Sequence, residues 1–252
     1  MAIRSNALPN TISVCLASYN GEKYIRQQID SILPQLKHGD ELLVSDDGSS
    51  DKTLLILNAY GKRLSIIASS RAGGVVKNFE RVISAASGSF IVLCDQDDIW
   101  LDGRVELIRG RLNHVTLLMM NGEVVDDELK PSGFDVYNFV SFRPGFFRNF
   151  ISTTYVGCCM AFRCELKNLV LPFPENIQWH DWYIALAAEL FYDVECSPVK
   201  TILFRRHQGN ASATGQISKA SFSSKLRNRY WMGRAITIFC LRVLRLRFQG
   251  RV

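Results

Sequence analysis

Several features that would place a protein in a class at once are missing from this 252-residue sequence. No apolar run reaches the roughly 18 uncharged residues that a membrane span needs. Residues 1–10 hold no apolar segment of the kind found in secretory signals. We therefore expect neither a membrane-spanning nor a secreted protein. Because 47% of the residues are hydrophobic and 21% are charged, the chain can bury a large core, which excludes intrinsic disorder.

The motifs of common metal and nucleotide sites are absent as well. The seven cysteines include no C-x-x-C pair, so neither a zinc ribbon nor a thioredoxin motif is indicated. Free buried thiols in a reducing cytoplasm are the simplest interpretation. Neither G-x-G-x-x-G nor the P-loop pattern ending in G-K-[ST] occurs, which argues against a standard dehydrogenase and against a P-loop NTPase.

Acidic residues are missing from the last part of the chain. The last one is Glu195, so residues 1–195 carry 24 acidic and 18 basic side chains, whereas residues 196–252 carry 12 basic and no acidic ones. Such a basic end favours a polyanionic partner: nucleic acid, anionic lipid or a phosphate-bearing substrate. The acidic body argues against a protein built wholly around nucleic acid.

The first 120 residues alternate apolar strand patterns with helical ones. We expect strands at residues 11–17, 41–45, 64–68 and 90–94, and helices at residues 23–33, 51–60 and 75–86. This alternation predicts βαβ units and an α/β fold with a mostly parallel central sheet. Ligands of such sheets bind at the carboxyl ends of the strands, so the residues that follow each strand become candidates for a site.

The second half is less regular. We expect strands at residues 115–120, 155–162 and 199–204, a helix at residues 180–192, and a long loop or lid at residues 131–148. A basic, apolar helix is expected over residues 225–252. Serine and glycine cluster near residue 215, so we divide the chain into a domain of residues 1–214 and a tail of residues 215–252.

The strongest chemical signal follows the apolar strand at residues 90–94. Asp95, Asp97 and Asp98 lie within four residues, and three carboxylates repel one another unless a cation joins them. Mg²⁺ and Mn²⁺ take carboxylate oxygens and keep positions open for phosphate. An ordinary solvated acidic turn is the alternative.

Three further positions carry weaker signals. Asp46 and Asp47 end the second strand, where a carboxylate can accept hydrogen bonds from a nucleobase; a turn with a helix cap is the alternative. Gly73-Gly74 precedes a helix, where phosphate can approach the backbone, although a simple tight turn fits equally. His207 follows a strand among arginines, which makes a ligand role a hypothesis, although a lone histidine is more often structural or at the surface.

A fourth candidate opens the helix at residues 180–192. Asp181 lies in its first turn, where a carboxylate favours the positive helix end for structural reasons alone. Because Trp179 and Trp182 flank it and aromatic faces pack on sugars, it is equally a candidate base beside a sugar.

The tail leaves three interpretations open. Its arginines do not share one face at helical spacing, so an interfacial helix on an anionic membrane is only one of them. A helix packed on the domain with solvated arginines and a nucleic-acid-binding element are the others.

Four segments, in their order and spacing, resemble those of family 2 glycosyltransferases of the GT-A fold. They are Ser18-Tyr19-Asn20-Gly21, Asp46-Asp47-Gly48-Ser49-Ser50-Asp51, Asp95-Gln96-Asp97-Asp98-Ile99-Trp100 and His180-Asp181-Trp182. The resemblance covers roughly residues 10–212, and the string Asp95-Gln96-Asp97-Asp98-Ile99-Trp100 is most similar to the bacterial rhamnosyltransferase-like branch, which builds O-antigen and other surface polysaccharides. The segment at residues 69–74 departs from the family, because no Asn precedes its glycines.

The resemblance implies a role for each matching position. The nucleotide-sugar donor would contact Ala17, Ser18, Tyr19, Asp46, Asp47, Gly74, Asn78, Asp95 and Gln96. A Mn²⁺ or Mg²⁺ ion would be held by Asp95, Asp97 and His207. The catalytic base would be Asp181, with Gly157, Trp179, His180 and Trp182 on the acceptor side.

The implied reaction is an inverting, metal-dependent transfer from a nucleotide-diphosphate donor to a lipid-diphosphate-linked glycan. The branch suggests dTDP-rhamnose, with UDP-galactose or UDP-glucose as alternatives. The enzyme would be cytoplasmic, peripheral on the inner face of the bacterial cytoplasmic membrane through contact with anionic lipid, without a nucleic-acid partner. A nucleotidyltransferase and a non-catalytic polyanion- or membrane-binding module are the competing hypotheses.

Overall fold

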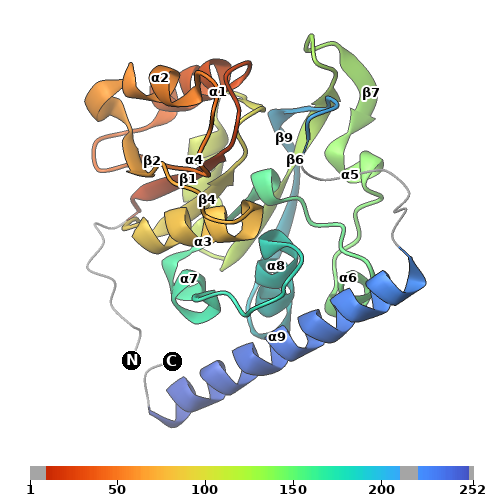
Figure 1. Ribbon diagram of the computed structural model, residues 1–252. Coiled ribbons are helices and arrows are strands. Elements are labelled where there is room, and N and C mark those ends of the chain that lie inside the picture. Colours follow the sequence, from red (N-terminus) through yellow and green to blue (C-terminus); the bar gives the residue numbers. More distant parts are fainter. Residues whose placement is uncertain (1–9, 211–220, 250–252) are drawn as a thin grey trace.

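A computed structural model describes residues 10–210 and 221–249. Its centre is one mixed sheet with the strand order β3-β2-β1-β4-β8-β6-β9-β5, and β7 pairs with β6 (Figure 1). The strands are β1 (Ile12–Ser18), β2 (Glu41–Asp46), β3 (Ser65–Ala68), β4 (Phe90–Cys94), β5 (Ile99–Trp100), β6 (Leu117–Val125), β7 (Pro131–Asp135), β8 (Met160–Arg163) and β9 (Val194–Arg205).

The first four strands form the parallel half of the sheet. They are joined by α1 (Ile25–Ile32), α2 (Thr53–Asn58) and α3 (Val75–Ala85), with the 3-10 turns η1 (Leu33–Gln35) and η2 (Gly61–Arg63). The chain passes outward through β2 and β3 and then returns to β4 on the far side of β1, so α3 covers the face opposite α1 and α2. The predicted α/β fold is confirmed, and the four predicted strands are present.

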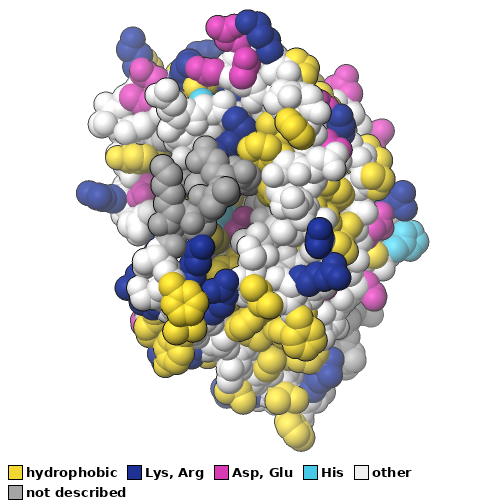
Figure 2. Space-filling model, turned by 90° about the vertical axis from the view of Figure 1, so that its right-hand side faces the viewer, with side chains coloured by type: hydrophobic (Ala, Val, Ile, Leu, Met, Phe, Trp, Pro, Cys, Tyr) yellow, Lys and Arg dark blue, Asp and Glu magenta, His cyan; other side chains and the backbone are white. Residues whose placement is uncertain are grey.

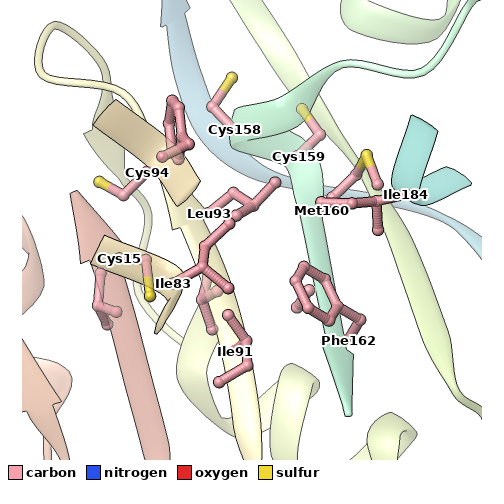
Figure 3. Close-up of a cluster of buried hydrophobic side chains, with 14 of the residues drawn as sticks. Cys15, Ile83, Ile91, Leu93, Cys94, Cys158, Cys159, Met160, Phe162 and Ile184 are labelled. Atoms are coloured by element: carbon pink, nitrogen blue, oxygen red, sulfur yellow. The ribbon is translucent and has the colours of Figure 1, made fainter. Parts of the chain in front are cut away.

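Burial on both faces explains why β1, β2 and β4 contain continuous apolar runs. Every residue of β4 is buried, and Ile91 and Leu93 lie beside Met160 and Phe162 of β8 (Figure 3). None of the seven cysteines, all of which lie within the described residues, forms a disulfide, and five of them are buried, as expected for buried thiols. Packing is close enough that a Cβ on Gly88 would lie 2.8 Å from the backbone nitrogen of Ser13.

The second half adds antiparallel pairs. β8 runs antiparallel to β4 and β6, while β9 runs parallel to β6 and carries β5 on its other edge. The intervening helices are α4 (Arg104–Leu112), α5 (Val136–Phe139), α6 (Phe146–Ile151), α7 (Cys164–Val170) and α8 (His180–Phe191), with the 3-10 turn η3 (Gly157–Cys159).

Two expectations for this half are wrong. Residues 131–148 are not a long loop, because β7 pairs with β6 and the Asp135 carboxylate caps α5 by accepting a hydrogen bond from the Asn138 N–H (2.7 Å). The strand expected at residues 155–162 begins later, at Met160, since η3 takes up residues 157–159.

The chain closes with α9 (Phe222–Phe248), a 27-residue helix that runs beneath α6, α7 and α8 (Figure 1). It begins at Ser221, whose hydroxyl accepts a hydrogen bond from the Ser224 N–H. None of the helices in residues 10–210 and 221–249 is long and apolar enough to cross a bilayer. The expected domain boundary between residues 214 and 215 lies outside the described residues.

Candidate active site

The carboxyl ends of β1 and β2 are tied together at the edge of the sheet. The Ser18 hydroxyl donates to Asp46 (2.8 Å), and the Asp47 N–H donates to the Ser18 carbonyl (2.9 Å). Asp46 is fully buried and also accepts hydrogen bonds from the Ser49 N–H and hydroxyl. Asp46 therefore fixes the shape of this edge and positions Asp47 beside it.

The Asp47 carboxylate faces the turn before α3. It accepts hydrogen bonds from the backbone N–H groups of Ala72, Gly73 (3.1 Å) and Gly74 (2.9 Å). Partial burial raises the pKa of Asp47, but these donors outweigh it and hold that pKa below its usual value. Gly73 and Gly74 both have positive φ, 98° and 110°, which explains why glycines occupy the turn.

A second clamp joins β1 to the chain after β4. The Tyr19 N–H donates to the Gln96 side chain (2.9 Å), whose amide nitrogen donates to the Tyr19 carbonyl (3.0 Å). A Cβ on Gly21 would lie 2.3 Å from the Gln96 Oε1, so a glycine there makes room for the clamp. Tyr19 is exposed, and Ala17 is partly buried at the same strand end.

Asn78 lies in α3 behind these strand ends. Its amide nitrogen donates to the Ser18 carbonyl (3.1 Å), and its oxygen accepts from the Ser45 hydroxyl (2.7 Å). Because it is buried and both polar atoms are engaged, Asn78 joins α3 to the ends of β1 and β2. A direct contact with the donor stays a prediction.

The structure brings two of the three predicted metal ligands into contact. His207, just after β9, places its Nε2 2.8 Å from Asp97 Oδ2. Asn210 donates to the same carboxylate oxygen (3.0 Å), a contact that sequence reasoning missed although Asn210 is only three residues beyond His207. One carboxylate therefore gathers an imidazole and an amide that are more than 100 residues away in the chain.

Asp95 and Asp98 form a second group with Cys158. Single ligand atoms of the three residues all lie within 4.8 Å of one another. Desolvation and Asp97 raise the pKa of Asp98 to about 7, and desolvation together with neighbouring carboxylates raises that of Asp95 well above its usual value. Asp98 Oδ2 is buried without a hydrogen-bond partner among the described residues. Carboxylates this close, one of them with an orphaned oxygen, fit a hard divalent cation nearby.

Two buried arginines lie behind the acidic edge, and sequence reasoning missed both. The Arg205 N–H donates to Asp98 Oδ1 (3.0 Å), and its Nε donates to the Asp97 carbonyl (2.8 Å). Arg104 is fully buried and donates to the Thr201 hydroxyl (2.5 Å) and to the Cys158 carbonyl (2.6 Å). Arg104 thus anchors η3, the turn that carries Gly157.

Asp181 lies at the start of α8, opposite η3. Its two carboxylate oxygens accept hydrogen bonds from the Gly157 N–H (3.0 Å) and the Trp182 N–H (2.7 Å). Desolvation outweighs these donors and raises the pKa of Asp181 to about 6. A Cβ on Gly157 would be in ordinary contact with Asp181, 3.4 Å from its Cβ and 3.5 Å from its Oδ2, so the glycine leaves space beside this partly exposed residue.

The aromatic residues around Asp181 point in different directions. Trp182 is buried and its indole N–H donates to the Asn149 carbonyl (2.7 Å), whereas Trp179 is partly exposed. His180 is buried and stacks on Phe79 at 3.9 Å between ring centroids, and burial lowers its pKa to about 3. Trp179 is therefore better placed than Trp182 to face a ligand.

A pocket opens next to this helix start. It lies between the beginning of α3 and the chain that leads into α8, and its lining includes Gly74, Lys77 and Phe173. Glu80 of α3 joins the two walls by accepting a hydrogen bond from the Phe173 N–H (2.8 Å). The turn held by Asp47 thus forms one rim of this pocket, and residues 173–177, which lead into α8, form the other.

Comparison with known proteins gives consistent relatives. WfgD of Escherichia coli, named a UDP-Glc:alpha-D-GlcNAc-diphosphoundecaprenol beta-1,3-glucosyltransferase, is 26% identical over 190 residues, 73% of each chain. RfbG of Shigella flexneri, named a dTDP-rhamnosyl transferase, is 28% identical over 241 residues, 86% of this chain and 80% of the relative.

Solved structures agree at the level of the fold. S. aureus TarS, solved with UDP-GlcNAc, superimposes with a TM-score of 0.66 at 20% identity over 92% of this chain. This chain spans 66% of that TarS chain. A mannosyltransferase from Pyrobaculum calidifontis, solved with GDP-Man and Mn²⁺, gives a TM-score of 0.55 at 16% identity over 97% of this chain and 76% of the other.

The family model described as "Glycosyl transferase family 2" matches residues 13–169, which is more than half of the chain and includes β1, β2, β4 and the acidic residues at their ends. The protein therefore belongs to glycosyltransferase family 2.

Proposed function

We propose that this glycosyltransferase moves a sugar, with inversion, from a nucleotide-diphosphate donor to a hydroxyl of a lipid-diphosphate-linked glycan during the assembly of a surface polysaccharide such as O-antigen. The activities for which RfbG and WfgD are named support dTDP-rhamnose or UDP-glucose as the donor, and the activity of WfgD supports a diphosphoundecaprenol-linked acceptor. The site of action would be the cytoplasmic face of the membrane, reached by peripheral contact.

One observation carries the proposal: an open carboxylate faces an acidic edge where a diphosphate and a cation can meet. Asp181 is close enough to Asp95 to contribute to the raised pKa of the latter. A sugar held between them would have its anomeric carbon within reach of both a base and the leaving group.

Asp181 is the proposed catalytic base. With a pKa of about 6 it is mostly ionised at pH 7, yet basic enough to take a proton late in the reaction. The acceptor oxygen attacks the anomeric carbon as Asp181 takes its proton, and the bond to the diphosphate oxygen breaks. The Gly157 and Trp182 N–H groups hold the carboxylate in place during this step.

Asp95, Asp97 and His207 are the proposed ligands of Mn²⁺ or Mg²⁺. Carboxylate oxygens suit both ions, and one imidazole nitrogen is tolerated by Mn²⁺ in particular. When bound, the ion would neutralise charge on the departing nucleotide diphosphate. The orphaned Asp98 oxygen and the contact between Asp97 and His207 support a cation at this edge.

The donor would lie along the ends of β1, β2 and β4. Its base would donate hydrogen bonds to the Asp47 carboxylate and so replace the backbone N–H groups of residues 72–74, which donate to this carboxylate in the structure. The remaining donor-site residues would be Ala17, Ser18, Tyr19, Asp46, Gly74, Asn78, Asp95 and Gln96. The acceptor would meet Gly157, Trp179 and His180, with Trp182 supporting them from the core.

A thermal-shift panel of dTDP, UDP, GDP and CDP, with and without Mn²⁺, tests the donor site. We expect a metal-dependent rise in Tm with one nucleotide, since a ligand that binds only the folded state stabilises it by mass action. Asp97→Ala should lose the Mn²⁺-dependent part of the shift, whereas Asp127→Ala, an acidic residue outside the proposed ligand set, should keep it. No shift with any nucleotide, or an unchanged shift in Asp97→Ala, would contradict the proposed donor and metal sites.

A further inference from the structure

The outward face of α9 carries an ordered stripe of apolar side chains. Its opposite face is buried against the domain through Met232, Ala235, Ile236, Phe239 and Val243. At about 100° per residue, six exposed apolar residues fall within an arc of about 100° on the outward side. They are Phe222, Leu226, Tyr230, Leu241, Leu244 and Phe248. The stripe has two parts, residues 222–230 and residues 241–248, at the two ends of the helix. Between them the same side carries Thr237, which is exposed, and Gly233, where an added Cβ would lie 3.5 Å from Phe150 Cζ of α6.

The arginines that obscure this pattern in the sequence have two separate jobs. Arg229 donates to the Ile151 carbonyl, and Arg242 donates to the carbonyls of residues 169, 170 and 172, so both tie the helix to the domain. Three exposed arginines, Arg227, Arg234 and Arg245, form one row about 20° to 40° beyond the edge of the apolar stripe.

The surface of the neighbouring helix α6 also carries exposed apolar side chains. Phe147 and Ile151 of α6, which packs against α9, are also strongly exposed. On the face seen in Figure 2, hydrophobic and basic side chains share the lower part, and acidic side chains gather mainly toward the top and one edge. No acidic residue follows Glu195 in the sequence, so α9 itself carries no negative charge.

We propose that this stripe, with its row of Arg227, Arg234 and Arg245, is the surface by which the enzyme docks on an anionic lipid bilayer, with α9 lying in the plane of the interface. Exposed aromatic and aliphatic side chains insert at the headgroup boundary, and the arginines pair with lipid phosphates. The inference deepens the proposed function, on which it rests, by naming the surface through which a lipid-linked acceptor is reached. A second copy of the chain is a poorer occupant, because two such faces would bring like charges together.

Vesicle co-sedimentation with the full-length protein tests the surface. We expect binding to vesicles that contain phosphatidylglycerol, and little to pure phosphatidylcholine. The triple variant Arg227→Glu, Arg234→Glu, Arg245→Glu should bind at least about 100-fold more weakly, since each basic residue near an anionic surface contributes about fivefold. The variant Leu241→Gln, Leu244→Gln, Phe248→Gln should lose binding through its apolar part.

Matched controls separate docking from general charge and folding. Lys52→Glu, Lys62→Glu, Lys130→Glu makes the same charge change on exposed residues of the domain, and Leu55→Gln removes an exposed leucine of α2; both should bind like the parent protein. Equal binding of the α9 variants, equal loss in the controls, or equal binding to both lipids would overturn the proposal. A lipid-independent dimer that the apolar variant dissociates would assign the face to a second copy instead.

The readout is independent of catalysis. Asp181→Asn should bind vesicles normally, and the α9 variants should keep the nucleotide-dependent rise in Tm. Vesicle binding without turnover of any nucleotide sugar would therefore contradict the proposed function and support the docking surface. Turnover with soluble acceptors but no vesicle binding would support the proposed function and contradict the docking surface.

Discussion

At the scale of single residues, the ionisation of Asp181 sets the expected pH dependence. Desolvation raises its pKa from the ordinary value to about 6, so the protonated, inactive form accumulates as the pH falls below about 6. We expect kcat/KM to fall about tenfold per pH unit below that point and to level off above it. A cation bound nearby would lower the pKa of Asp181 and so move this fall in kcat/KM to lower pH. A pH-rate profile at fixed Mn²⁺ measures it, and a rate that stays constant down to about pH 4 would remove Asp181 from the role of base.

Asp181→Asn gives the complementary measurement. We expect it to lower kcat by at least about 10²-fold while nucleotide binding is kept, because the amide cannot take the proton. Gln178→Glu, a change near the same helix start, is a control that should keep activity. Normal turnover of the Asn variant would contradict the proposed mechanism.

Sequence reasoning predicted those residues of the proposed site that can be recognised by chemical type alone. Carboxylates that follow apolar strands can be identified in the sequence directly, and the side chains of Asp97 and His207 are in contact in the structure. Arg104 was not foreseeable, because a lone arginine in a helical pattern reads as a solvated one, and only the fold shows that it lies under η3. The engagement of Asp47 with residues 72–74 was also hidden, since it depends on the path of a loop.

At the scale of elements, two hydrogen bonds between Gln96 and the Tyr19 backbone join the chain after β1 to the chain after β4, and Gly21 leaves room for the Gln96 side chain. In Gly21→Ala the new Cβ would displace the flexible Gln96 side chain and break its two hydrogen bonds to the Tyr19 backbone. We expect the loss of these hydrogen bonds to cost about 1–3 kcal/mol at this strand end. The consequence should be nucleotide binding weakened about fivefold or more with a fall in Tm of only a few degrees.

Gln96→Ala is the matched control, because it removes the clamp without adding bulk. Isothermal titration with the nucleotide chosen by the thermal-shift panel compares the two variants. Equal affinities for the parent and both variants would show that the clamp does not shape the donor site.

The elements themselves were predictable where one pattern decides them. β1, β2, β4 and α3 have long apolar signals that match their burial, and all four appear close to the expected residues. β7, α5 and α6 were missed because each is short: β7 forms a hairpin with β6, Asp135 caps α5, and the chain before α6 is held by the distant Glu189 carboxylate, which accepts from the Gly145 N–H. Local patterns carry no record of such contacts.

At the scale of the whole molecule, α9 belongs to the fold as well as to the surface. Its buried face includes Phe239, Val243 and Met232, whose burial contributes about 1.5–3 kcal/mol each. Truncation before residue 222 should therefore give an unstable or aggregating protein, since a domain has only about 5–15 kcal/mol of net stability. Chemical denaturation of the truncated chain measures this, and a cooperative transition with unchanged midpoint would contradict it.

Arg104 and Arg205 give the acidic edge a counter-charge that cannot diffuse away. Both are buried, both are fixed by backbone contacts, and neither depends on a ligand. If a nucleotide diphosphate leaves together with a cation, as proposed, the carboxylates of the strand ends would still face fixed positive charge. The enzyme between turnovers would then keep the shape that the next donor must meet, without reorganisation in each cycle.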